Sequence, residues 1–217
     1  MKGKASTGPH CLVIGLGNPG KRYESSRHNA GFRVVERLAL QSKALFSAHA
    51  RIPALVADWK TKGFQWIALK PVTFMNLSGQ AVAAALNFWK FELSSLMIVL
   101  DDVELKPGEL RLRKQGGTGG HQGLNSIIEH LHTRQFARLR IGIGRPSAPD
   151  IDLSKWVLES FEKTELPRLE DSIRKAVGAI ETWVAAGLDV AMNRYNRQTA
   201  PKPKDVHPDS RRKTNIL

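Results

Sequence analysis

The sequence predicts one α/β domain, an α/β/α sandwich around a mixed, mostly parallel and twisted sheet. Three observations lead to this prediction. Short apolar runs, which are typical of strands, alternate with segments of helical periodicity. The length of 217 residues suits one domain with a large buried core. The turn Thr61-Lys62-Gly63 joins two of the apolar runs, so one antiparallel hairpin is expected in the sheet.

The individual elements follow from the local pattern. Strands are predicted where short apolar runs are bounded by turn residues, at 11–16, 53–59, 64–70, 96–100, 110–112 and 139–143. Helices are predicted where apolar residues recur every three or four positions, at 31–41, 79–91, 123–131, 165–186 and 188–195. Ser78 is expected to cap the second helix, and Gly187 to end the fourth.

The two ends of the chain differ from its body. Residues 1–10 hold no apolar run, and we expect a flexible extension there. Residues 199–217 combine Pro, Lys, Arg and Asp with too little apolar content to fold, which predicts a basic, disordered tail. The domain is therefore expected to span residues 11–198.

The composition is that of an ordinary globular protein, with 41% hydrophobic and 24% charged residues. No apolar run approaches the ~20 residues of a membrane-spanning helix, so no membrane contact is expected. The first ten residues lack the apolar core of a secretory signal, and Cys11 is the only cysteine. These features predict a soluble protein of the reducing cytoplasm.

The net charge is +13, and most of the surplus lies in the body of the chain rather than at its ends. A folded body with this charge is expected to attract polyanions, above all nucleic acid. The alternative is that the charge serves solubility alone.

The first candidate site is a histidine close to a glycine-rich turn. Residues 15–20, Gly-Leu-Gly-Asn-Pro-Gly, follow an apolar strand, and His28 comes shortly before a predicted helix. An imidazole has a pKa of about 6.5, so it can take a proton from water at neutral pH. The alternative is a capping or surface histidine.

The same turn matches the G-x-G-x-x-G spacing of a dinucleotide site. However, clear helical periodicity begins too far after the third glycine, and Glu36 falls in a helical stretch rather than after a second strand. We instead expect the turn to present Asn18 toward whatever His28 attacks.

The second candidate site is Asp101-Asp102, directly after the apolar run 96–100. Carboxylates at the carboxyl end of a strand in an open α/β sheet lie where ligands bind. An aspartate there could accept the imidazole N–H of His28 and stabilise the imidazolium. The alternatives are a Mg²⁺ site or solvated turn residues, but no further acidic cluster accompanies the pair.

The third candidate site is the glycine-rich stretch 116–123, preceded by Arg111, Arg113 and Lys114. It suggests a mobile lid whose flanking cations hold phosphates, with a plain flexible loop as the alternative. Asn76, at a strand-to-helix junction, is a further candidate for holding substrate or a simple turn residue.

The sequence gives little support for a covalent nucleophile or for a metal site. No G-x-S-x-G elbow is present, and Cys11 starts a predicted strand, where it is expected to be a small buried hydrophobe. His130 and His132 lack a third metal ligand at suitable spacing. Water is the expected nucleophile, and the residues call for no metal or cofactor.

Over residues 12–197 the chain resembles the bacterial-type peptidyl-tRNA hydrolase family. The resemblance rests on ordered motifs in one register, namely the stretches 15–20, 27–31, 70–79, 101–102, 107–108, 116–123 and 138–146, together with Tyr23. It implies an enzyme that cleaves the ester between a peptide and the 3′ end of tRNA without a metal. Nothing in the sequence pattern demands more than a monomer.

The resemblance also implies roles for single residues. These are His28 as general base, Asp101 as its orienting partner, Asn18 and Asn76 as groups that bind the peptide and polarise its carbonyl, Tyr23 and Met75 as lining of the cleft, and Arg111, Arg113 and Arg140 as tRNA contacts. The chain departs from the family where Gln122 replaces an asparagine that positions substrate, and where Asn125 replaces a lysine. These departures leave open a non-hydrolytic RNA-binding relative of the type used for splicing in plant organelles.

Overall fold

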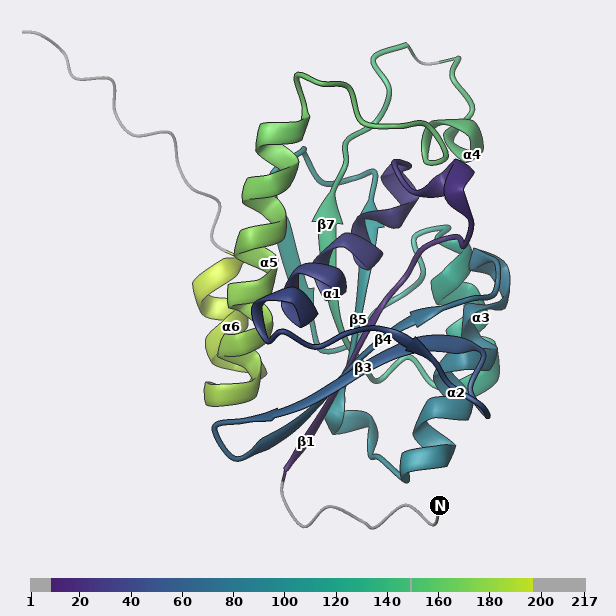
Figure 1. Ribbon diagram of the computed structural model, residues 1–217. Helices are drawn as coiled ribbons and strands as arrows, with labels where there is room; N and C mark the ends of the chain where they lie inside the picture. The colour runs from purple at the N-terminus through teal and green to yellow at the C-terminus, as the bar shows by residue number, and fades with distance from the viewer. Residues whose placement is uncertain (1–8, 149, 197–217) are drawn as a thin grey trace, which may run out of the picture.

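The computed structural model describes residues 9–148 and 150–196. Its centre is a seven-stranded sheet in the order β2-β3-β4-β1-β5-β7-β6 (Figure 1). The strands are β1 (His10–Gly15), β2 (Ser47–Ala48), β3 (Ala54–Thr61), β4 (Phe64–Pro71), β5 (Leu96–Asp102), β6 (Leu110–Arg113) and β7 (Ala137–Gly142). The four central strands β4, β1, β5 and β7 are parallel, whereas β2, β3 and β6 run antiparallel to their neighbours. The mixed sheet and its hairpin are confirmed.

Helices cover both faces of this sheet. One face carries α1 (Ala30–Gln41), α5 (Leu166–Ala186) and α6 (Leu188–Tyr195), and the other carries α2 (Ser78–Trp89) and α3 (Gln122–Leu131). A short helix, α4 (Leu153–Trp156), lies near the carboxyl ends of the central strands (Figure 1). Four single turns of 3₁₀ helix, Lys21–Tyr23, Arg27–Asn29, Met75–Leu77 and Leu93–Ser95, complete the described elements.

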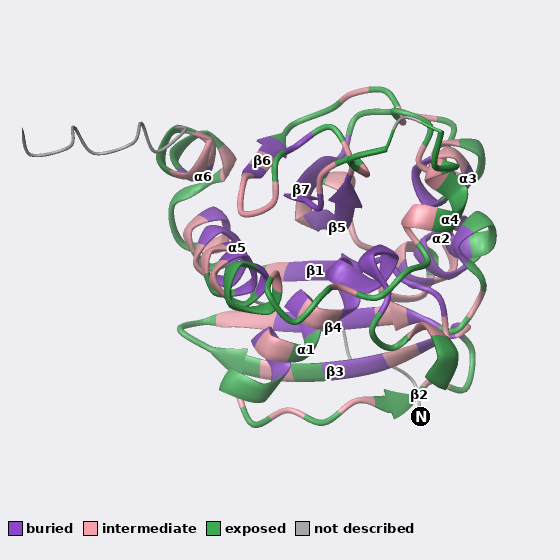
Figure 2. Ribbon diagram, turned by 90° about the horizontal axis from the view of Figure 1, so that it is seen from above, coloured by how far each residue is buried: buried purple, intermediate pink, exposed green. Residues whose placement is uncertain are grey.

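The core is divided between the two faces. Along β1, Cys11 and Val13 pack under α1 and α5, while Leu12 and Ile14 pack under α2 and α3. Because both faces are buried, the central strands are apolar throughout instead of alternating with polar residues. Figure 2 shows this buried interior between the helices. The predicted three-layered sandwich is therefore confirmed.

Several predicted boundaries need correction. β5 continues to Asp102, so both carboxylates belong to the strand, and β7 covers 137–142 instead of 139–143. Ser78 does not cap α2: it is the first helical residue, and its Oγ donates to the Met75 carbonyl oxygen at 2.8 Å. That helix ends at Trp89, before Lys90 in a left-handed conformation, and not at residue 91. Gly187 ends α5 as predicted.

The two shortest elements, β2 and α4, were not predicted, because two and four residues show no periodicity. At the amino end, β1 begins at His10, within the segment expected as an extension. The predictions for residues 1–8 and for the tail 199–217 lie outside the described residues. No helix of the described part is long and apolar enough to span a bilayer.

Candidate active site

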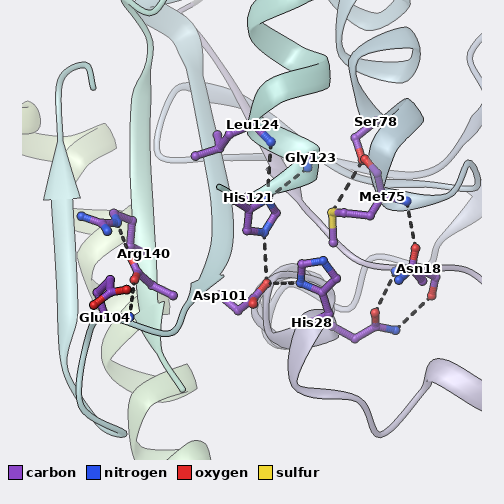
Figure 3. Close-up of polar contacts among 12 residues, drawn as sticks. Asn18, His28, Met75, Ser78, Asp101, Glu104, His121, Gly123, Leu124 and Arg140 are labelled. Carbon is purple, nitrogen blue, oxygen red and sulfur yellow. Dashed lines mark hydrogen bonds and ion pairs between the residues drawn. The ribbon is translucent and has the colours of Figure 1, made fainter. Parts of the chain in front are cut away.

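His28 and Asp101 come together where two adjacent strands end. His28 belongs to the 3₁₀ turn that follows the β1 loop and leads into α1, and Asp101 is the penultimate residue of β5. The His28 Nδ1 lies 2.8 Å from the Asp101 Oδ1, and both side chains are buried (Figure 3). β1 and β5 are hydrogen-bonded neighbours, which is why residues 73 positions apart meet here.

His121 contacts the same carboxylate oxygen. Its Nε2 lies 3.2 Å from the Asp101 Oδ1, while its Nδ1 accepts the backbone N–H groups of Gly123 and Leu124 at the start of α3. Because Nδ1 accepts two hydrogen bonds, the ring proton is on Nε2 and is donated to Asp101. One oxygen of Asp101 thus receives two imidazole N–H groups.

These contacts set the ionisation of the pair. Burial alone would raise the pKa of Asp101, but the charge of His28 and the hydrogen bond from His121 outweigh burial and hold that pKa well below its usual range. Burial lowers the pKa of His28, yet the charge of Asp101 and the hydrogen bond to it raise this pKa above its ordinary value overall. Asp101 is therefore ionised, and His28 donates Nδ1–H to it.

The other ring nitrogen of His28, Nε2, is available to react. Within the described residues, no group forms a hydrogen bond with the His28 Nε2. A cleft of about 470 Å³ borders His28 and Asp101 and is also lined by the glycine-rich residues 116–120 and by the first turn of α3. An imidazole with one nitrogen held by a carboxylate and the other facing a cleft can accept a proton from water.

Asn18 is fixed on the other side of His28. Its Oδ1 accepts the Met75 backbone N–H at 2.8 Å, and Asn29 holds its backbone through two further hydrogen bonds. The Asn18 oxygen is therefore occupied, and its Nδ2 is the group free to donate. Figure 3 shows Asn18 and Met75 on one side of His28, with Arg140 on the far side of Asp101.

Three of the four predicted substrate-binding residues lie on the Asn18 side, not in the 470 Å³ cleft. Tyr23 contacts Phe74 edge to face, with ring centroids 6.5 Å apart. Met75 is buried, and Asn76 is exposed in the next position of the same 3₁₀ turn, without a hydrogen bond in the part of the chain described here. Gln122, in contrast, is exposed at the first position of α3 and lines the cleft.

The arginines form one face of the antiparallel strand pair β6 and β7. In the strand register Arg111 lies opposite Arg140, and Arg113 lies opposite Arg138. The alternate leucines and isoleucine of these strands pack under α5, so the arginines share the opposite face. Like charges placed in this way repel each other, and an anion bound across them relieves the repulsion.

Two of these arginines have partners. Arg140 pairs with Asp102, whose other oxygen accepts the backbone N–H of Glu104 at 2.8 Å. Asp102 is thus a buried ion-pair partner, while Glu104 is exposed and pairs with Arg145. The buried Arg138 donates to the carbonyl oxygens of Gly116 and Gly117, and so anchors the glycine-rich stretch.

The geometry argues against a metal at these carboxylates. Within the described residues, one group of ligand atoms could surround an ion, that of His28, Asp101 and His121. However, the Nε2 of His121 carries the proton that Asp101 accepts, so it offers no lone pair. Asp102 forms an ion pair with Arg140, so its role differs from that of Asp101.

Glycine in the first turn serves packing, since a Cβ on Gly15 would lie 2.3 Å from the Gly31 carbonyl oxygen, so the turn gives no reason to expect a dinucleotide. A Cβ on Gly31 would lie 2.4 Å from the Val99 carbonyl oxygen, so only glycine lets α1 approach β1 and β5 this closely. The helix itself begins at Ala30, well after Gly20, and its first turn holds no acidic residue. Cys11 is buried, and burial raises the pKa of its thiol to about 12, so it is no nucleophile.

Four residues of the site were assigned no role from the sequence: His121, Asn29, Arg138 and Arg27. Each stands inside one of the motifs named above, one or two positions from a residue that was chosen. The available signals were a histidine between a run of glycines and a helix start for His121, and the alternation of Arg with Leu in 110–113 and 138–141 for Arg138.

The mixed α/β sheet, with a buried imidazole–carboxylate pair beside a cleft, places the chain among α/β enzymes. A family model described as peptidyl-tRNA hydrolase matches residues 12–204. A peptidyl-tRNA hydrolase of Syntrophomonas wolfei is 48% identical over 185 residues, which are 85% of this chain and 99% of that protein. One from Thermosynechococcus vestitus is 42% identical and covers 89% of this chain and 97% of its own length.

The structural comparison agrees. The crystal structure of peptidyl-tRNA hydrolase from Acinetobacter baumannii is 34% identical, covers 86% of this chain and 94% of that one, and superposes with a TM-score of 0.80. The chain belongs to the peptidyl-tRNA hydrolase family.

Proposed function

We propose that this protein hydrolyses the ester that links a peptide to the 3′ end of tRNA, with His28 as the general base. The observation that carries the proposal is the 2.8 Å contact between His28 Nδ1 and Asp101 Oδ1, which leaves the His28 Nε2 beside a cleft and without a partner among the described residues. Family membership supplies the substrate class.

In the proposed reaction, the His28 Nε2 takes a proton from a water molecule as its oxygen attacks the ester carbonyl carbon. Asp101 stabilises the imidazolium that forms and keeps the ring in the required tautomer. The Nδ2 of Asn18 donates to the carbonyl oxygen as negative charge develops there. The carbon–oxygen bond to the ribose then breaks, and His28 returns the proton to the leaving ribose oxygen. The products are a peptide with a free carboxyl group and tRNA with a free hydroxyl.

The two sides of His28 suit the two parts of this substrate. On the β6–β7 side, Arg111, Arg113 and Arg140 present positive charge that we propose binds the phosphates of the acceptor end. On the opposite side, Val72, Phe74 and Leu77 are exposed apolar residues around Asn76, near Tyr23. We assign the peptide to this apolar side, with Asn76 and Met75 contributing to its binding.

Gln122 occupies the position where the family carries asparagine. Its amide lies at the rim of the cleft, on the first turn of α3. We propose that it positions water or substrate beside His28, with the adjacent glycines adjusting for the extra methylene. We also propose that the protein acts as a cytoplasmic monomer, because one chain supplies the imidazole, the carboxylate and the arginine face.

The test is release of tRNA from an N-acetyl-aminoacyl-tRNA in buffer that contains a chelator. Turnover under these conditions, together with slow hydrolysis of the same aminoacyl-tRNA with a free α-amino group, is expected. Tight binding of tRNA without any release would contradict the proposal and would instead support the non-hydrolytic RNA-binding alternative. Equal rates on the two substrates would contradict the assignment of a peptide side.

A further inference from the structure

Arg27, the neighbour of His28 in the chain, is among the most deeply buried residues of the protein, with 1% of its surface exposed. Its guanidinium lies over the ring of Trp156, 3.7 Å from the ring centroid, and also faces Phe161. Its two terminal nitrogens donate to the two carboxylate oxygens of Glu165, each at 2.8 Å. A planar guanidinium held by stacking and by a bidentate carboxylate has a fixed orientation.

The backbone around Arg27 is bound to the same region. The N–H of His28 donates to the Val157 carbonyl oxygen at 2.8 Å, and that of Arg27 to Glu159 at 2.9 Å. Ser26 and Ser160 form an antiparallel bridge. The segment 157–160 therefore runs beside the residues that carry the imidazole, as Figure 1 shows for α4 and the purple segment before α1.

This region also forms a wall of the cleft. Leu153, Ser154 and Val157 line the cleft together with His28 and Asp101. Trp156, between them, donates its indole N–H to the Gly144 carbonyl oxygen at 2.8 Å. Arg27 thus connects the cleft wall, through Trp156, with the backbone that holds the general base.

Stability alone is a poor explanation for such an arrangement. Burying the Arg27 guanidinium costs desolvation, which its attraction to the partly exposed Glu165 offsets only in part. The Arg27 Nε is also buried without a hydrogen-bond partner among the described residues, which adds to that cost. What the arrangement does provide is a fixed position for His28.

We propose that Arg27 is a positioning residue. Its contacts with Trp156 and Glu165 hold the 153–160 segment against the His28 backbone, and thereby fix both the direction of the imidazole toward Asp101 and the cleft wall. The inference rests on the proposed function only for its consequence in turnover, because the position of the imidazole can be observed separately.

The test compares Arg27→Met with Arg37→Met. Arg37 also joins α1 to α5 through a glutamate, Glu170, but lies at the surface away from the cleft. For Arg27→Met we expect kcat to fall by about 10- to 100-fold with KM changed by less than about threefold, because misplacing a catalytic group by about 1 Å has this effect. Arg27→Lys, which keeps the charge, should recover part of kcat, and Arg37→Met should leave both constants within about twofold.

Because Arg27→Met removes a buried side chain, Glu165→Gln serves as a milder variant; the Glu165 side chain is 25% exposed. Glu165→Gln should also lower kcat. An unchanged kcat in folded Arg27→Met and Glu165→Gln, or a thermal stability that falls while kcat per folded molecule stays constant, would overturn the inference.

A measurement without turnover separates this inference from the proposed function. The proton on the His28 Nδ1 and the His28 amide are followed by NMR in the wild type and the variants. We expect Arg27→Met to shift the ring proton and to speed exchange of the amide, and Arg37→Met to change neither. Unchanged His28 signals in Arg27→Met would overturn the positioning role. A wild type that lacks turnover, with His28 signals that do respond to Arg27→Met, would overturn only the function.

Discussion

His121 donates its Nε2 proton to the same Asp101 oxygen that holds His28, at a distance of 3.2 Å. Asp101 is therefore oriented from two sides, by His28 in the 3₁₀ turn that leads into α1 and by His121 directly before α3. The hydrogen bond from the second imidazole helps to lower the pKa of Asp101 and so favours the ionised carboxylate that holds His28.

The two contacts of His121 can be separated by substitution. His121→Ala removes both the hydrogen bond to Asp101 and the cap of α3, and loss of a cap costs about 1 kcal/mol. His121→Asn keeps a capping oxygen but loses the imidazole N–H. We expect urea melts to show that His121→Asn is more stable than His121→Ala. In both variants kcat should be about tenfold lower than in the wild type. Full activity of a stable His121→Asn would contradict the second contact to Asp101.

The pH dependence of hydrolysis follows from the raised pKa of His28. The base must be neutral to accept a proton, so kcat/KM should rise with pH through a midpoint above the ordinary pKa of about 6.5. Asp101→Asn removes the charge that raises this pKa, and the midpoint should move to lower pH while the maximal rate falls. Rate profiles from about pH 5 to 9 check this. A midpoint that moves upward in Asp101→Asn would contradict the assigned coupling.

The arginine face makes a graded prediction for tRNA binding. Arg113 is exposed, whereas Arg140 is already paired with Asp102. Arg113→Ala should lower the slope of log affinity against log salt by about one, and Arg140→Ala by less. The control is Lys62→Asn in the turn between β3 and β4, where asparagine tolerates the left-handed backbone. Titration of tRNA at several salt concentrations measures the slopes, and equal slopes for Arg113→Ala and the wild type would contradict the assigned surface.

Gln122 should act through its amide group and not through its length. We expect Gln122→Asn to keep kcat/KM within about threefold of the wild type, and Gln122→Ala to lower it by about tenfold. Both variants should unfold at the wild-type urea concentration, since the side chain is exposed at the start of α3. A fully active Gln122→Ala would show that the amide has no part in the reaction.

Close packing at Gly31 predicts a large effect on stability. A Cβ at this position would lie 2.4 Å from the Val99 carbonyl oxygen and 2.5 Å from the Leu16 backbone nitrogen, which cannot move without disturbing the sheet. Gly31→Ala should lower the free energy of unfolding by about 2–4 kcal/mol. Gly117→Ala is the control, because nothing lies within 4 Å of its Cβ. Equal urea midpoints for the two variants would contradict the close approach of α1 to β1.

Much of the fold could be predicted from local pattern. The central strands are apolar because both faces are covered, and the long helices α1, α5 and α6 show clear periodicity. The meeting of His28 and Asp101 was also accessible, since residues that follow neighbouring parallel strands lie at one edge of a sheet.

Contacts made by irregular segments could not be predicted. Arg27 and Glu165 are 138 positions apart, and the segment between β7 and α5 shows no repeating pattern that would place Trp156 over the guanidinium. The ring orientation of His121 depends on the exact start of α3, which the sequence located at 123 and the structure at 122. Periodicity reports which face of an element is buried, not which side chains meet across a loop.

The central claim, that His28 activates water, is tested most directly by single-turnover hydrolysis of N-acetyl-aminoacyl-tRNA at saturating enzyme. At saturation the rate reports the chemical step and not binding. His28→Ala should slow this step by at least about 100-fold, while the dissociation constant for tRNA stays within about threefold of the wild type. A single-turnover rate in His28→Ala within about threefold of the wild type would contradict the mechanism.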